Sequence, residues 1–156
     1  MVDSPSTSAV PAVIDALLAA ATTALVDVAV YDGTGISDDP GDFLMVGVED
    51  PDSDTFATSV DAQQSWPHIG HRVRDESGDI TCSALSWNGD GDQKAARDAV
   101  YAITAQLEEL LRDDPTLGLG PLVRTEFGTT SQLIQRQGDS GAMAMLTFKV
   151  HFDARI

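Results

Sequence analysis

Two stretches of the chain repeat their apolar residues every three to four positions, the spacing that places them on one face of a helix. The first covers residues 10–24, with Pro11 in its first turn and Ser8 as a possible cap. The second begins at Asp92 and ends before the helix-breaking sequence DDPTLGLGP. The pattern therefore predicts two amphipathic helices.

Between and after these helices the apolar positions alternate with polar ones, as in strands. The pattern predicts strands at 26–32 and 42–49, and the near-continuous apolar content of the second indicates burial on both faces. Residues 69–87 read as a hairpin whose turn is formed by residues 76–79. Two long arms, 122–137 and 142–154, are joined by GDSG, whereas 56–66 is ambiguous between strand and loop.

Strands that meet in hairpins, with the helices set apart from them, are typical of an α+β fold. We expect a mostly antiparallel sheet with both helices packed on one face. Residues 9–156 should form a single domain, and the polar, Ser/Thr-rich segment 1–8 should be flexible.

The formal net charge of the 156-residue chain is −16, and its nine Lys and Arg residues are scattered. Binding to nucleic acid or to an anionic membrane requires a basic patch, so neither is expected. The chain begins without a basic segment ahead of an apolar run, and its apolar runs are too short to span a bilayer. We therefore expect a soluble protein made inside the cell.

The stretch WNGDGDQKAARD resembles a phosphate-binding loop at first sight. A P-loop needs Lys followed by Ser or Thr after its glycines, and here the carboxylates of Asp90 and Asp92 would repel a phosphate. The stretch suits a turn into a helix, with Asp92 capping the free amides of the first helical turn.

Four aspartates have part of the spacing of a calcium-binding loop, at positions one, three, five and twelve: Asp50, Asp52, Asp54 and Asp61. Position six is Thr55 where the loop needs Gly, and a strand rather than a helix precedes the segment. The spacing alone does not supply the loop geometry, so a solvated acidic loop is the preferred interpretation and a calcium-dependent binding module the alternative.

No arrangement of residues predicts an enzyme. Cys82 lies in an apolar row between Ile80 and Ala84, which is typical of a buried side chain rather than a nucleophile. His68 and His71 are three apart in a segment that reads as extended, where they would point to opposite faces. We expect no catalytic residue, no cofactor and no metal.

Several phrases of the sequence do carry a resemblance: GDFLMVGVED, CSALSWNGDGDQKAARDAVYAI, DPTLGLGP and GDSGAMAMLTFKVHFDARI. With the order of the predicted elements, they make residues 9–156 similar to the tail terminator proteins of long-tailed phages (siphoviruses) of actinobacteria, which belong to the lambda-type tail terminator family.

The resemblance implies a structural protein of the virion, assembled in the host cytoplasm. It implies a homohexameric ring that caps the tail tube, ends its polymerisation and forms the head–tail joining interface. Its partners would be sister copies, the tail tube protein and a head-completion (neck) protein. DNA would pass through the ring without specific binding, and no membrane is involved.

The alternation of the strands adds a hypothesis about the ring. If the helices cover one face of the sheet, the other face can line the channel, and it carries Thr81, Ser83, Met145, Thr147, Lys149 and His151. A head-completion or stopper protein of the phage neck would share the ring and the acidic charge, and only its partner would distinguish it.

Overall fold

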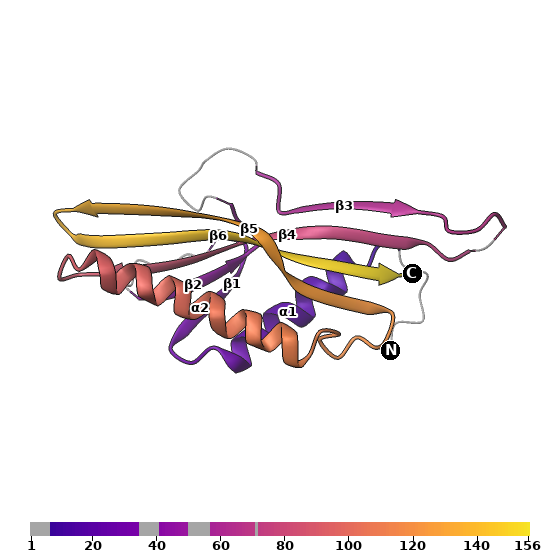
Figure 1. Ribbon diagram of the computed structural model, residues 1–156, viewed down its shortest axis with the longest axis horizontal. Helices are drawn as coiled ribbons and strands as arrows, with labels where there is room; N and C mark the ends of the chain where they lie inside the picture. The colour runs from indigo at the N-terminus through magenta and orange to yellow at the C-terminus, as the bar shows by residue number, and fades with distance from the viewer. Residues whose placement is uncertain (1–6, 35–40, 50–56, 71) are drawn as a thin grey trace.

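The computed structural model of the chain describes residues 7–34, 41–49, 57–70 and 72–156 and has an α+β fold. Figure 1 shows two helices lying on one side of a long, twisted sheet. The elements in chain order are α1 (Val10–Ala24), β1 (Val28–Asp32), β2 (Asp42–Val46), β3 (Val60–Ser65), β4 (Asp75–Asn88), α2 (Gln93–Asp113), β5 (Val123–Gly138) and β6 (Gly141–Arg155).

The strand order across the sheet is β1-β2-β4-β6-β5, and β3 pairs with β4 as well. Every pairing is antiparallel except that of β1 with β2. β2 and β3 follow one another along the same side of β4, since Val46 pairs with Cys82 and Val60 with Ile80. The chain leaves the sheet after Gly47 and returns at Ser59.

The core lies between the sheet and the helices. Alternate residues of β4 and β6, among them Cys82 and Phe148, are buried against the apolar stripes of α1 and α2. Leu17 of α1 and Leu107 of α2 are fully buried. Both helices therefore cover one face of the sheet, as the periodicity predicts, because each has one apolar stripe to remove from water.

The start of α1 differs from the prediction that Ser8 caps it. The N-cap position is Ala9, whose backbone N–H donates to a carboxylate oxygen of Glu76 at 2.7 Å. The hydroxyl of Ser8 accepts from the N–H of Val10 and donates to Glu76. A strand residue thus satisfies the helix end. Of the segment 1–8 that we expected to be flexible, residues 1–6 lie outside the described residues, and Ser8 is held by these bonds.

The start of α2 has the local cap that its sequence suggests. Asp92 occupies the N-cap position, and its side chain accepts from the N–H of Ala95 at 3.1 Å. The side-chain oxygen of Asn88 accepts from the N–H groups of Asp90 and Asp92, which closes the turn between β4 and the helix. The glycine- and aspartate-rich stretch is therefore a strand-to-helix turn.

The prediction of a hairpin with its turn at residues 76–79 is wrong. β4 runs through these residues without interruption, and the connection to β3 lies at 66–74. Gly78 accounts for the error, because it stands mid-strand where neighbours crowd the backbone. A Cβ at Gly78 would lie 2.8 Å from the ring of Phe152 and 2.8 Å from the carbonyl oxygen of Asp61. The glycine permits close packing and does not form a turn.

Candidate functional site on the helix-free face of the sheet

The side of the sheet opposite the two helices is called the helix-free face here. The strand pairing places Thr81 opposite Lys149 and Ser83 opposite Thr147, with Met145 and His151 on the same side. The six residues predicted from alternation to line a channel, Thr81, Ser83, Met145, Thr147, Lys149 and His151, therefore share this face.

Three of the six are not exposed, which corrects the prediction for them. Thr81, Ser83 and Met145 are only 1%, 0% and 5% accessible. The hydroxyl of Ser83 donates to the carbonyl oxygen of Val48 at 2.6 Å, so the segment that follows β2 passes over it. Buried side chains cannot line a channel, and the prediction is reduced to Thr147, Lys149 and His151, which are half-buried.

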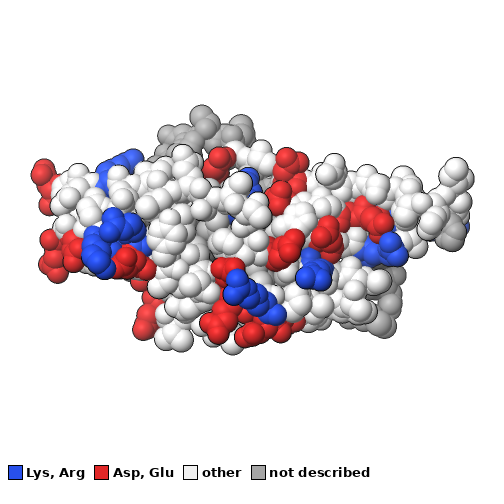
Figure 2. Space-filling model, in the orientation of Figure 1, with Lys and Arg blue, Asp and Glu red and all other residues white. Residues whose placement is uncertain are grey.

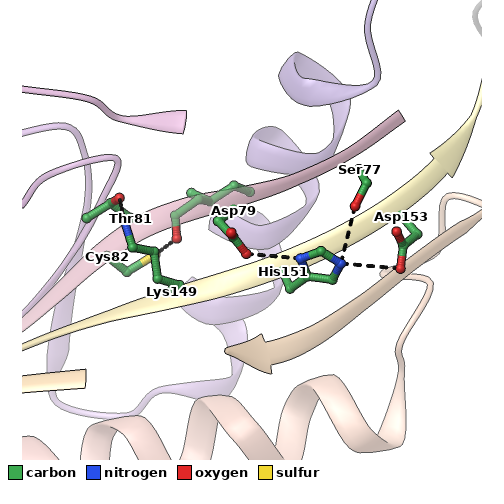
Figure 3. Close-up of polar contacts among 8 residues, drawn as sticks. Ser77, Asp79, Thr81, Cys82, Lys149, His151 and Asp153 are labelled. Atoms are coloured by element: carbon green, nitrogen blue, oxygen red, sulfur yellow. Dashed lines mark hydrogen bonds and ion pairs between the residues drawn. The ribbon is translucent and has the colours of Figure 1, made fainter. Parts of the chain in front are cut away.

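His151 is the centre of a polar cluster on this face (Figure 3). Its Nδ1 lies 3.0 Å from a carboxylate oxygen of Asp79, and its Nε2 lies 3.4 Å from Asp153 and 3.4 Å from the hydroxyl of Ser77. The largest single influence on the pKa of His151 is burial, which lowers it because the charged imidazole is taken out of water. The hydrogen bond to Asp79 and the charges of Asp153, Asp79 and Glu126 together outweigh it, so the pKa of His151 is raised.

The pairing extends this cluster into a row across four strands. Asp61 lies opposite Asp79, Asp79 opposite His151, and His151 opposite Glu126. We call these four residues the acidic row. The row contains three carboxylates and one histidine, so its charge stays negative even when the imidazole is protonated. The nearby positive charge of Lys149 is held by a different residue of the sheet: its ammonium donates to the hydroxyl of Thr81 at 3.1 Å.

The other end of the helix-free face is apolar. Neighbouring strands place a continuous set of large side chains there: Tyr31, Phe43, Met45, Leu85, Trp87, Met143, Met145 and Ile134. The rings of Tyr31 and Phe43 lie 5.9 Å apart, and Ile134 is 37% exposed. Sequence alternation identified Met145 alone, because the other members become neighbours only when the strand register is known.

The charged side chains visible in Figure 2 do not form a basic site. On the face of the molecule in Figure 2, Lys and Arg side chains are interspersed with acidic ones and do not gather into a continuous basic patch.

No cluster of three metal-binding side chains occurs among the described residues. Of the calcium candidates, Asp50, Asp52 and Asp54 lie outside the described residues, and Asp61 is an exposed residue of β3. The calcium alternative stays a prediction.

Cys82 is buried on the opposite, helix-covered side of β4. Burial raises the pKa of its thiol to about 12, because the thiolate would have to form away from water. Its side chain behaves as a small apolar group packed in the core, which is what the apolar row from Ile80 to Ala84 predicts.

An open groove of about 630 Å³ lies where β3, β4 and β6 meet residues 121–124. Its ionisable side chains include Asp75 and Arg155, which pair across β4 and β6 at 2.7 Å. The hydrogen bond from Arg155 lowers the pKa of Asp75. The pair therefore joins the ends of two strands, and both groups are held in their charged forms.

No protein-family model matches the chain, and no curated protein matches it in sequence. Among the described helices, none combines the length and the apolar content needed to cross a membrane.

Proposed function

We propose that this chain is a structural protein of a long-tailed phage of actinobacteria, which forms a ring on the end of the tail tube. The ring stops the addition of tube subunits and presents a joining surface to the head. The observation that carries the proposal is a one-sided sheet with both helices behind it, edged by β5 on one side and by β1 and β3 on the other. Such a sheet has a face and two edges to offer to other copies.

The charge of the chain supports a ring through which DNA moves. A subunit with a net charge of −16 repels a polyanion, so DNA would not adhere to the channel wall. The acidic row adds a local reason, since its carboxylates lie on the helix-free face beside Thr147 and Lys149. In this proposal the polar end of the helix-free face lines the channel.

The shape of the molecule supports contacts with more than one partner. In Figure 1 the β5–β6 hairpin and the β3–β4 hairpin extend past the helices toward opposite ends of the molecule. The connection between β3 and β4 carries Trp66 and Ile69, which are 62% and 105% exposed. A ring built from such subunits would present exposed apolar groups at the end that carries the β3–β4 connection and the polar tip of the β5–β6 hairpin, residues 135–141, at the other.

The proposal is tested with the purified chain in two steps. Native mass spectrometry and negative-stain images should show a closed ring, with six copies as the expected number. The ring is then mixed separately with the tail tube protein and with the neck proteins encoded in the same genome. Binding to tube ends supports the terminator role. Binding to neck proteins alone identifies a stopper, and a monomer at every concentration overturns the ring.

A further inference from the structure

β1 and the later part of β5 lie at the same level on opposite outer edges of the sheet and have matching side chains. Following the pairing across the sheet, Ala29 of β1 is aligned through Phe43, Leu85 and Met145 with Ile134 of β5. The same path aligns the whole of β1, residues 28–32, with residues 135–131 of β5. The short edge strand therefore occupies the same five rows as one part of the long edge strand.

The strand directions fit an antiparallel junction between copies. β1 is parallel to β2, and the pairings from β2 to β4, β6 and β5 are all antiparallel, so β1 and β5 run in opposite directions. If a second copy continues the sheet with its helices on the same side, its β1 meets β5 of the first copy in antiparallel orientation. Antiparallel pairing exchanges backbone hydrogen bonds that each edge otherwise leaves to water.

Only part of β5 is open to such a partner. At the start of the strand, the N–H and the hydroxyl of Thr125 both donate to the carbonyl oxygen of Pro115, so a loop covers that stretch of the edge. The register then breaks between Phe127 and Ser131. Beyond the break β5 pairs with β6 and with no other described strand, as β1 does with β2. The open part of β5 is the part at the level of β1.

The side chains that would face one another are compatible. On the helix side, Val30 of one copy would lie opposite Leu133 of the next, and both are half-buried apolar residues that pack against the core. On the helix-free side, Ala29 would lie opposite Ile134, which extends the apolar end of that face across the junction. Asp27, in the turn just before β1, would lie near the level of Arg136, which places opposite charges near the junction.

We infer that β1 of one copy adds to the 131–135 edge of β5 in the next copy, and that this head-to-tail pairing closes the ring. Because the two edges differ, the contact is heterologous, and heterologous contacts generate rings when the rotation between copies closes. The inference rests on the proposed ring and names its interface. A second copy is the occupant, since the direction, level and apolar pattern of β1, and the charge of Asp27 just before it, match this edge.

Disulfide trapping in the assembled full-length protein tests the interface. In the double variant Ala29→Cys/Ile134→Cys, the paired Cα atoms would be about 4.5–5.5 Å apart, within reach of a disulfide. Mild oxidation should give a ladder of covalent oligomers. The unmodified chain is the control for Cys82, which is buried. The double variant Ala29→Cys/Arg124→Cys should give no ladder, because Arg124 lies roughly 30 Å along β5 from Ile134.

The single variant Ile134→Cys separates the alternatives. If two β5 edges pair with each other, this variant alone forms covalent dimers, and the inference is wrong. If native mass spectrometry shows a ring but the double variant Ala29→Cys/Ile134→Cys gives no ladder, the inferred interface is wrong while the proposed ring is supported. A chain that stays monomeric in native mass spectrometry overturns both, and the two failures are therefore distinguishable.

Substitutions at the edge give a second readout. Ile134→Lys places a charge on the edge and should shift the protein from rings to monomers with an unchanged circular dichroism spectrum. Tyr101→Lys is the matched control on α2, where the side chain is 47% exposed, and should leave rings intact. Arg136→Glu should weaken assembly roughly two- to fivefold by repelling Asp27, and Asp27→Asn in the same chain should reverse much of that loss. Equal effects of Ile134→Lys and Tyr101→Lys would contradict the interface.

Discussion

The carboxylate of Glu76 accepts a hydrogen bond of 2.7 Å from the backbone N–H of Ala9, so a strand residue completes the first turn of α1. Glu76 is only 3% exposed and also accepts from the hydroxyl of Ser8 and the amide of Gln64. These bonds join the start of the helix to β4 and β3. The buried carboxylate is therefore the connection between the helical layer and this end of the sheet.

Replacing this carboxylate should destabilise the fold. Glu76→Ala removes the acceptor for a buried backbone N–H and leaves it without a partner, which costs about 2–4 kcal/mol when the neighbouring polar bonds are also lost. The free energy of unfolding from a denaturant titration measures the effect. Glu109→Ala, at an exposed position of α2, should change it by less than about 0.5 kcal/mol. Equal losses for the two variants would contradict the capping role.

Gly78 should not tolerate a side chain. In Gly78→Ala the new Cβ would be 2.8 Å from Phe152 and from the Asp61 carbonyl, and overpacking of this kind costs about 1–3 kcal/mol. Gly138→Ala is the matched control, since a Cβ there meets nothing within 4 Å. Thermal unfolding of both variants checks the prediction. A Gly78→Ala protein as stable as the Gly138→Ala protein would show that the strands part easily at this point.

The charge of His151 should contribute to stability only while the imidazole is protonated. Its pKa is raised in the folded protein, so the contribution is full below the unfolded value of about 6.5 and is lost as the pH rises through the higher folded value. The stability difference between the parent chain and His151→Gln should therefore shrink above about pH 6.5. Denaturant titrations at several pH values measure this difference.

The cause of the His151 shift can be tested separately by NMR titration of the imidazole. Asp79→Asn removes the hydrogen-bonding carboxylate and should lower the pKa of His151. Asp90→Asn removes the same charge from an exposed turn and should leave that pKa nearly unchanged. An equal fall in both variants would mean that the total charge of the chain, and not the acidic row, sets the titration.

Cys82 should be unreactive until the protein unfolds. Its thiol is buried and its pKa is raised to about 12, so the thiolate that attacks a disulfide reagent does not form in the native state. A colorimetric thiol assay should show reaction only over the denaturant range in which the circular dichroism signal is lost. Fast labelling in native buffer would contradict the burial of this strand.

Local patterns in the sequence were enough for the helices and for most strands. The apolar period predicts residues 10–24 as a helix, and α1 spans Val10–Ala24. The turn at Asn88 and the cap at Asp92 lie within five residues of the helix they start, so their chemistry is readable locally. The fold class follows, because helices with one apolar stripe must cover an apolar sheet face.

Relationships between distant residues were not predictable in the same way. Glu76 accepts a hydrogen bond from the N-cap residue Ala9, 67 positions earlier in the chain, and nothing near Ala9 indicates it. Gly78 looks like a turn residue because the ring that crowds it belongs to Phe152 in β6. Alternation correctly assigned Ser83 to the helix-free face. The carbonyl of Val48 that covers it lies within residues 42–49, predicted as one strand, whereas β2 ends at Val46.

The length of tail tubes assembled in the presence of the chain tests the central proposal most directly. Tube subunits from the same genome would be polymerised with and without the purified protein, and tube lengths and ends would be measured in negative-stain images. The proposal predicts that elongation stops, with a ring on one end of each tube. Tubes that lengthen equally in both samples, with bare ends, would contradict it.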